Sequence, residues 1–479
     1  MKIAMLSPEI APFAKTGGLA DMVSALANAL ARQGHELCLI MPAYRSVFLG
    51  DFSFEEPSVK VSVPHCERSV ETSVLRVSST GSSVVYLVRA DHYYDREQLY
   101  GTPEGDYSDN AERFAFFNRA ALEILRQWQP DIIHCHDWHT ALAPVFLKIQ
   151  AERYPELAGA KTVFTVHNMA FQGIFGPDHW EPLGLPWDYF APQFLEYYGN
   201  INFLKGGLLF ADKVTTVSPS YACEIQEMEQ GFGLDGVLRA RADCVVGILN
   251  GVDDREWNPK CDPHIAKSYN GSNPAAKRQC KKALQRLAGL PEESGVPLLA
   301  LLCRLASQQG MDLVEQILDP LLECDVQWVV VGAGEPRYEK VFAEAAKQYP
   351  KKIAFKAEGD ELLTHRILAG ADILLMPSRY EPCGLQQLFA LKYGTIPVVH
   401  AVGGLKDSVA DYQSKPADGT GFLFAAYDAR ALLGAIDQAL QVYRNKRAWS
   451  GLRKRAMSRD FSSDRSAEEY TRVYRELMA

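Results

Sequence analysis

Short apolar runs alternate with longer amphipathic stretches along most of the 479-residue chain. The first run, at 2–6, leads through a glycine pair to an amphipathic stretch at 19–32, and the next run follows at 36–41. Strands that alternate with helices are typical of parallel sheets, because parallel neighbours need a crossover connection between them. The pattern therefore predicts an α/β fold in which helices cover both faces of a mainly parallel sheet.

The alternation occurs in two series. In the first, strands are expected at 2–6, 36–41, 84–88, 132–135, 162–166 and 213–217, with helices at 19–32, 112–128, 141–150 and 203–210. In the second, strands are expected at 298–303, 327–331, 353–355, 373–376 and 397–400, with helices at 311–323, 338–348, 365–369 and 385–393. Single cores stop growing near about 250–300 residues. We therefore predict two doubly wound domains, 1–249 and 250–457, joined by a hinge and an entry helix between 250 and 297.

Composition excludes several classes of protein. The 50 basic and 59 acidic residues give a net charge of −9, which disfavours general nucleic-acid binding but leaves room for a local anion site. The ten cysteines include no C-x-x-C pair, which argues against a zinc ribbon and favours a reducing compartment. No apolar stretch approaches the ~18–20 residues that span a bilayer, and the first nine residues make a poor signal peptide. We expect a cytoplasmic protein with no nucleic-acid or membrane partner.

The segment Lys15-Thr16-Gly17-Gly18 lies between the first strand and the first helix. Glycines there let the backbone approach an anion, and a helix N-terminus supplies N–H donors and positive dipole. The spacing matches neither a Walker loop nor G-x-G-x-x-G. On this motif alone, an anion site and a tight turn with a surface lysine are equally favoured.

A histidine-rich segment follows the strand at 132–135. His134 and His136 share one face of that strand, so a metal site is one interpretation. A closed metal site usually needs four ligands, and no second cluster has suitable spacing. We favour the other interpretation, in which Asp137, Trp138 and His139 line a cleft and bind a polyol.

Further polar groups follow other strands, where ligands of α/β folds usually bind. His167 ends the strand at 162–166, and Arg304, a fixed cation suited to phosphate, follows the first strand of the second domain. Glu381 precedes a helix after the strand at 373–376, and Gly403-Gly404-Leu405 offers backbone N–H groups for an anion. Each has a structural alternative: a satisfied histidine, a surface ion pair, a helix-start acid or a turn.

Six motifs occur in order along the chain: KTGGLAD at 15–21, HDWH at 136–139, VHN at 166–168, NGVD at 250–253, EPCGL at 381–385 and GGL at 403–405. Together they resemble the bacterial glycogen synthases and plant starch synthases, and the resemblance covers essentially the whole chain. It implies the GT-B architecture, with two Rossmann-like domains facing across a cleft and residues 458–479 forming a helix that crosses back to the first domain. It also implies retaining transfer of glucose from ADP-glucose to the 4-hydroxyl at the non-reducing end of an α-1,4-glucan, without a metal or cofactor.

The resemblance assigns roles to the motif residues. Donor binding falls to Lys15, Gly17, Gly18, Arg304, Gln309, Gly403, Gly404 and Leu405. Acceptor binding falls to Tyr94, Asp137, Trp138, His139 and Asn250. Glu381, His167, Lys15 and Arg304 would act in catalysis. These roles suit the chemistry, because fixed cations should face the leaving diphosphate and a carboxylate should face the developing positive charge on the sugar.

Two departures from the family fall on the donor side. Gln309 stands where the family has a lysine in S-R-L-x-x-Q-K-G, and a charge-assisted hydrogen bond is worth roughly 1.5–3 kcal/mol, or about 10- to 150-fold in rate. Gly359 stands where the family usually has an aromatic residue that stacks on the base, a contact worth ~1–3 kcal/mol. A further departure, Ser463 in place of the Trp of F-S-W, should affect packing alone.

The departures leave alternatives open. One is a paralogue with an altered or weak donor preference, and another is a catalytically impaired glucan-binding or regulatory protein. A third is a GT-B glucosyltransferase with a small sugar acceptor, which the KTGGL and DWH strings disfavour.

Overall fold

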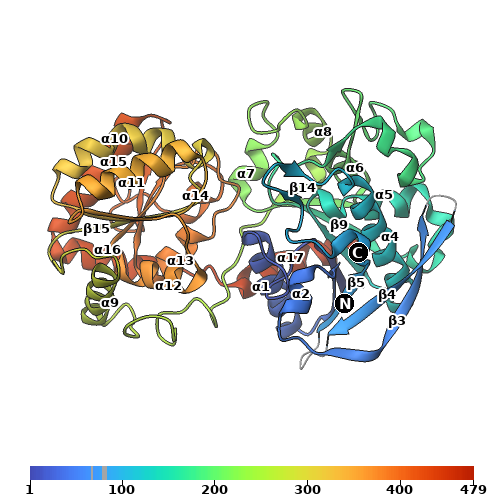
Figure 1. Cartoon of the computed structure of the whole chain (residues 1–479), viewed down its shortest axis with the longest axis horizontal. Coiled ribbons are helices and arrows are strands. Elements are labelled where there is room, and N and C mark those ends of the chain that lie inside the picture. The colour runs from blue at the N-terminus through green and yellow to red at the C-terminus, as the bar shows by residue number, and fades with distance from the viewer. Residues whose placement is uncertain (66–67, 78–82) are drawn as a thin grey trace. The chain divides into compact units, whose positions relative to one another are not determined.

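The computed structural model describes residues 1–65, 68–77 and 83–479, and these form two compact units (Figure 1). Unit 1 consists of Met1–Gly251 and Ser463–Ala479, and unit 2 of Val252–Ser462. The sequence placed these divisions at 249/250 and 457/458.

Unit 1 contains, within the described residues, a nine-stranded sheet of order β14-β13-β9-β8-β1-β2-β5-β4-β3. The strands are β1 (Lys2–Leu6), β2 (Glu36–Pro42), β3 (Phe54–His65), β4 (Arg68–Val77), β5 (Ser83–Arg89), β8 (Ile132–His136), β9 (Lys161–Val166), β13 (Lys213–Thr216) and β14 (Val245–Gly247). Strand β1 pairs in parallel with both β2 and β8. Polar residues that follow β1, β8 and β9 therefore gather at one edge of this sheet.

The antiparallel strands β3 and β4 extend this sheet beyond β5, and no strand was expected between 41 and 84. The alternation of buried Val61 and Val63 with exposed Ser62 is typical of a strand covered on one face. That signal was present in the sequence. The sheet of unit 1 is mainly parallel, as expected, and β3 and β4 add an antiparallel extension at one edge.

The helices of unit 1 are α1 (Gly18–Arg32), α2 (Arg45–Leu49), α3 (Asp91–Tyr94), α4 (Asn110–Trp128), α5 (Leu142–Ile149), α6 (Phe203–Phe210), α7 (Pro219–Glu224), α8 (Asp235–Ala240) and α17 (Ser463–Met478). Short strands β6 (Gly101–Thr102) and β7 (Gly105–Asp106) pair with each other, and β10 (Ile174–Phe175), β11 (Glu196–Tyr197) and β12 (Asn200–Asn202) form a small sheet. Helix α17, drawn in red, returns to unit 1 and packs beside α1 (Figure 1). It buries Tyr470, Val473 and Tyr474, whose spacing of three and four residues places them on one helix face.

Unit 2 contains a six-stranded sheet of order β17-β16-β15-β18-β19-β20, and its neighbouring strands are parallel. Its strands are β15 (Leu298–Leu302), β16 (Gln327–Val331), β17 (Ile353–Lys356), β18 (Ile373–Met376), β19 (Ile396–His400) and β20 (Phe422–Phe424). Its helices are α9 (Pro274–Leu287), α10 (Met311–Glu323), α11 (Pro336–Gln348), α12 (Glu361–Gly370), α13 (Gln386–Tyr393), α14 (Gly403–Ser408), α15 (Ala429–Arg444) and α16 (Lys446–Ser458).

The core of unit 2 lies on both faces of its sheet. Leu299 and Leu301 of β15 join the apolar cluster that contains residues of α10, α11 and α15, whereas Leu298 and Leu302 join the cluster of α9, α12 and α13. Alternate side chains of a strand point to opposite faces, so a strand buried on both sides reads as a continuous apolar run. Among the described residues, no helix has the length and apolar character needed to cross a membrane.

Candidate active site

The turn between β1 and α1 is open to solvent from Lys15 to Gly18. Helix α1 has Gly17 as its N-cap with no capping side chain, and nothing lies within 4 Å of where a Cβ on Gly17 would be. The ammonium of Lys15 lies 2.7 Å from a carboxylate oxygen of Asp21, in the first turn of α1. A cation therefore sits beside uncapped N–H groups at the positive end of a helix dipole, which is suited to an anion.

The buried side chain of Glu9 fixes this turn through hydrogen bonds. Its carboxylate is 4% exposed and accepts hydrogen bonds from the backbone N–H and hydroxyl of Thr16. The phenol of Tyr100 donates to the same carboxylate at 2.6 Å. Glu9 is not among the predicted site residues. Its position three residues after the end of β1 was the signal available in the sequence.

Asp137 ties the end of β8 to the end of β9. Its Oδ1 accepts the backbone N–H of His167 at 2.7 Å, and its own N–H donates to the carbonyl of Thr165 at 2.9 Å. Exclusion of water raises the pKa of this carboxyl to about 7. Its backbone φ of +58° is in the left-handed region, which is uncommon for a residue other than glycine. Asp137 therefore positions His167. The resemblance had assigned Asp137 to acceptor binding, which stays a prediction.

Three histidines form a chain behind the site. His167 Nε2 lies 3.1 Å from His136 Nδ1, and the ring of His136 lies against His134, with centroids 4.1 Å apart. Burial lowers the pKa of His134 and of His167 to about 3, so both are neutral at neutral pH. Both ring nitrogens of His134 are engaged, by the hydroxyls of Tyr474 at 2.8 Å and Thr165 at 2.5 Å. Both nitrogens of His134 are thus engaged within the protein, and the absence of a metal from this segment stays a prediction.

Changing Tyr474 to Phe should destabilise unit 1. The variant leaves the buried Nδ1 of His134 without its partner, and an unsatisfied buried polar group costs about 1–3 kcal/mol. We expect a lower urea midpoint for loss of the unit 1 fold. Tyr198→Phe, at a tyrosine that is 84% exposed, is the matched control, and an equal shift in both variants would contradict the assignment.

Tyr94, Trp138 and His139 are buried in this structure, and their contact with the acceptor stays a prediction. Tyr94 is fully buried, and its hydroxyl donates to the carbonyl of Arg113 at 2.9 Å. Trp138 and His139 are each 7% exposed and stack with ring centroids 3.9 Å apart. An aromatic residue after a strand can face ligand or core, and the sequence alone does not distinguish the two. Here Tyr94 packs against the ring of Tyr44, and Trp138 packs against His139.

Asn250 lies in the loop that follows β14. It is 6% exposed, and its side-chain Oδ1 has no hydrogen-bond partner among the residues that the structure describes. A buried acceptor without a partner is costly. Asn250 thus keeps a hydrogen-bonding position that a ligand hydroxyl could fill.

In unit 2, Glu381 lies in the loop between β18 and α13. The hydroxyl of Ser378 donates to its Oε2 at 3.1 Å, and the side chain of Gln309 and the backbone N–H of Gly384 also donate to the carboxylate. Removal from water nevertheless raises the pKa of Glu381 to about 7, because a desolvated carboxyl favours its neutral form. A carboxyl of this kind can be ionised near neutral pH inside a largely dry site.

Gln309 and Arg304 both follow β15 but have different surroundings. Gln309 ends the 3-10 turn Ser307–Gln309, and its side chain contacts both Ser378, at 3.4 Å, and Glu381. The sequence assigned Gln309 to the donor diphosphate and did not reveal its contact with Glu381. The guanidinium of Arg304 is exposed and makes no hydrogen bond or ion pair within the described ranges, so it is available to an anion.

The glycines at 403–404 have a different role from the one expected. The N–H of Gly404 donates to the carbonyls of Glu381 and Pro382, both at 3.2 Å. A Cβ on Gly403, whose φ is +40°, would lie 2.1 Å from the carbonyl oxygen of Glu381. Leu405 is fully buried. The expectation that Gly404 offers its N–H to a ligand is therefore corrected: these glycines let α14 approach the Glu381 loop closely.

Gly359 lies just before α12, whose N-cap Asp360 accepts the N–H of Leu363 at 2.7 Å. A Cβ at Gly359 would lie 2.4 Å from a methyl group of Val331. That contact is too close without a shift, so an aromatic residue would need Val331 or the backbone to move.

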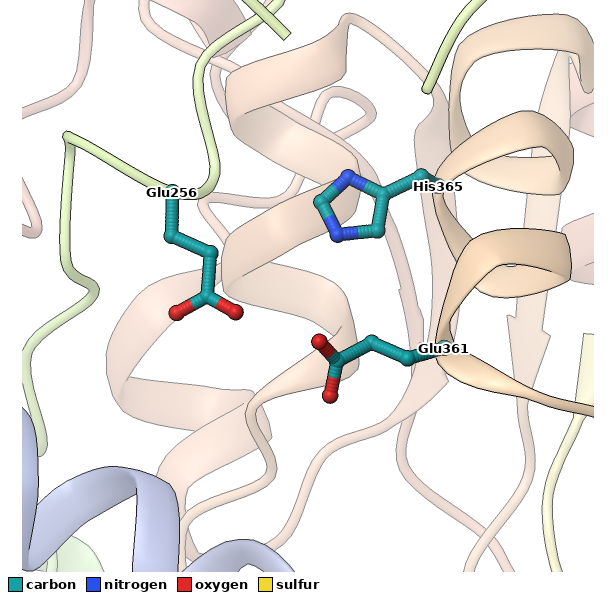
Figure 2. A group of neighbouring side chains, drawn as sticks. All are labelled: Glu256, Glu361 and His365. Atoms are coloured by element: carbon teal, nitrogen blue, oxygen red, sulfur yellow. The ribbon is translucent and has the colours of Figure 1, made fainter. Parts of the chain in front are cut away.

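One group of side chains in the described part of the chain has distances compatible with a metal ion: Glu256, Glu361 and His365, whose ligand atoms lie within 4.8 Å of one another (Figure 2). Both carboxylates are exposed, and such groups are common without a metal. His365 Nδ1 lies 2.8 Å from the buried carboxylate of Asp262, and its ring stacks on Trp257 at 3.9 Å. These contacts give His365 a packing role, and the absence of a metal from the reaction stays a prediction.

Comparison with known proteins covers both units. Residues 2–240 match the family model described as the starch synthase catalytic domain, and residues 288–452 match the glycosyl transferases group 1 model. The glycogen synthase of Koribacter versatilis is 45% identical over 99% of this chain and 98% of its own length. Glycogen synthase 2 of Geobacter sulfurreducens is 43% identical over 99% of this chain and 98% of its own.

Solved structures agree with these matches. The catalytic domain of starch synthase IV from Arabidopsis thaliana, bound to ADP and acarbose, has a TM-score of 0.91 and 32% identity, covering 100% of this chain and 99% of that one. Sucrose-phosphate synthase from Thermosynechococcus elongatus, at 17% identity and a TM-score of 0.61 over 99% of this chain and 98% of that one, shares the fold alone. The chain has the GT-B glycosyltransferase fold, and it belongs to the glycogen synthase family of hexosyltransferases.

Proposed function

We propose that this protein transfers glucose from ADP-glucose, with retention, to the 4-hydroxyl at the non-reducing end of an α-1,4-glucan. The site around Glu381 carries the proposal: a carboxyl held by Ser378, Gln309 and Gly384 at the carboxyl end of a strand in unit 2. The Arabidopsis relative, which binds ADP and acarbose, supports an adenine nucleotide as the donor and a glucan as the acceptor.

The charges of the two units suit the two halves of this reaction. Departure of the diphosphate develops negative charge, which Arg304 and the Lys15 turn are placed to receive within their own units. The sugar develops positive charge, which the carboxylate of Glu381 stabilises. His167, neutral and oriented by Asp137 and His136, would hydrogen-bond the transferred sugar.

The proposal is tested by transfer of labelled glucose to glycogen from ADP-glucose and, in parallel, from UDP-glucose and GDP-glucose. We expect clear turnover with ADP-glucose. Turnover with another nucleotide alone would indicate an altered donor, and transfer to a monosaccharide in preference to glycogen would indicate a small acceptor. Glycogen binding without turnover from any donor would indicate a glucan-binding protein.

Changing Arg304 to Gln should weaken ADP binding by about tenfold or more. The exposed guanidinium has no protein partner within the described ranges, and a hydrogen bond from a charged donor to phosphate is worth roughly 1.5–3 kcal/mol. Isothermal titration with ADP measures the effect. Arg337→Gln, on α11 and paired with Glu315, is the control, and unchanged ADP affinity in Arg304→Gln would exclude Arg304 from the diphosphate site.

Turnover should depend on pH through Glu381. Its pKa of about 7 means that the carboxylate form is lost as the pH falls through that value, and stabilisation of the sugar cation is lost with it. We expect kcat to rise from pH 6 to pH 8. A flat profile across this range would show that ionisation of Glu381 does not limit the reaction.

A further inference from the structure

A cavity of about 450 Å³ opens in unit 2 at the edge of the sheet opposite Glu381. Asp372 immediately precedes β18, and Gly295 lies shortly before β15, so both mark the amino ends of parallel strands. Helix α9, the end of α15 and helix α16 complete the lining. The cavity is therefore lined both by α9, the first long helix of unit 2, and by α16, its last.

The lining is strongly basic. Its cations are Lys277, Arg278, Lys281, Lys446 and Arg453, and its one carboxylate is Asp372. That carboxylate is already committed, since Asp372 Oδ2 lies 2.6 Å from Lys281 Nζ and 3.0 Å from the backbone nitrogen of Leu298. Four cations thus remain without a carboxylate in the lining. Of these four, Lys277 is buried and Arg453 is partly buried, whereas Arg278 and Lys446 are exposed. A desolvated cation is costly unless an opposite charge accompanies it.

Burial lowers the pKa of three cations of the lining, and repulsion between neighbouring cations adds to the effect. Burial, reinforced by the charge of Arg453, lowers the pKa of Lys277 to about 7. Burial also lowers the pKa of Arg453 and of Lys446, against the partial attraction of Asp372. A bound anion would oppose all three shifts.

Hydrogen-bond donors in the lining remain unused. The ammonium of Lys277 is fully occupied by the carbonyls of Leu368 and Ala369 and the hydroxyl of Thr395. In contrast, the Nε1 of Trp449, a residue only 4% exposed, and the Nε of Arg453 are both buried and have no partner among the described residues. Both groups can only donate, so an acceptor is what the cavity lacks.

We propose that this cavity binds a small phosphorylated molecule, whose phosphoryl oxygens accept hydrogen bonds from Arg453 and Trp449 and face the charges of Arg278 and Lys446. The planar guanidinium of Arg453 suits phosphate oxygens, since its N–H groups can bind two of them at once. A phosphate monoester and free phosphate share this chemistry, and the volume admits either. The ligand would link α9 to α16.

Isothermal titration of the full-length protein with inorganic phosphate and with glycerol phosphate, at constant ionic strength in chloride, tests the proposal. We expect saturable binding that Arg453→Gln weakens at least tenfold and that Lys446→Gln also weakens. Arg447→Gln, an exposed arginine on the same helix but outside the lining, should bind as the wild type does. Tighter binding of glycerol phosphate would identify an ester as the ligand, and equal binding would identify free phosphate.

The Arg304→Gln variant distinguishes phosphate binding at this cavity from binding at the donor site. Phosphate should still bind the cavity in that variant. Trp449 gives a second readout: phosphate should change tryptophan emission in the wild type but not in Trp449→Phe. Equal affinities in Arg453→Gln, Lys446→Gln and Arg447→Gln would overturn the proposal. So would loss of all phosphate binding in Arg304→Gln, or the absence of saturable binding by both probes.

Discussion

Glucose transfer should fall about 10²–10³-fold when Glu381 becomes Gln, measured at pH 8. At that pH most of the wild-type carboxyl is ionised, because its pKa is about 7. Glutamine keeps the size of the side chain and one acceptor oxygen but removes the charge that stabilises the sugar cation. Removing one preorganised electrostatic contact to a transition state typically costs roughly 2.7–4 kcal/mol. The readout is kcat with ADP-glucose and glycogen.

A measurement of the unfolding temperature distinguishes the loss of catalysis in Glu381→Gln from misfolding. The pKa of Glu381 is raised in the folded protein, so the stability that its neutral form contributes is present below the unfolded-state pKa and is lost as the pH rises through about 7. At pH 8, Glu381→Gln should therefore unfold at the same temperature as the wild type or higher. Glu344→Gln, at an exposed glutamate on α11, controls for a change of charge alone. Retention of more than a tenth of wild-type kcat would remove Glu381 from the catalytic role.

Changing Gln309 to Lys should raise turnover about 10- to 150-fold. One charge-assisted hydrogen bond contributes roughly 1.5–3 kcal/mol. If it forms in the transition state, this free energy corresponds to that increase in rate. The structure adds a second effect, because Gln309 contacts Glu381 directly. An ammonium at this position would favour the ionised carboxylate and lower the pKa of Glu381. The rise of kcat with pH should therefore begin at lower pH in the variant.

The two effects are measured together in one pH–rate series. Gln309→Met, which lacks both charge and hydrogen-bond donor, is the control and should not exceed the wild type. A gain in kcat without a shift of the pH profile would place the lysine at the diphosphate alone. No gain at any pH would show that this protein does not need the missing cation.

The sequence was sufficient for the alternation of strands and helices. The strands at 2–6, 327–331 and 373–376 and the helix at 311–323 have the predicted bounds. These segments succeed because a strand buried on both faces is an unbroken apolar run and a surface helix repeats every three to four residues. The hairpin of β3 and β4 was not among the predicted strands, although buried and exposed residues alternate along it.

The chemistry of the individual site residues needed the fold. Nothing in the sequence distinguishes Tyr94, whose hydroxyl is bonded to a backbone carbonyl, from a tyrosine that faces a ligand. Gly404 and Glu381 are separated by 22 intervening residues in the printed sequence, and only the neighbouring ends of β18 and β19 bring their backbones together. The contact of Gln309 with Glu381 arises in the same way, from the adjacency of β15 and β18.

The sequence by itself determined which residue types are present at the strand ends: a lysine beside two glycines, an arginine, a glutamate and a glutamine. It did so because motif spacing and apolar periodicity are local properties of the chain. Only the tertiary structure decided which of these groups are exposed, which bond to one another and which titrate near neutral pH. Burial and contacts between distant segments set those properties, as the pKa of about 7 for Glu381 and the basic cavity at the opposite edge of its sheet illustrate.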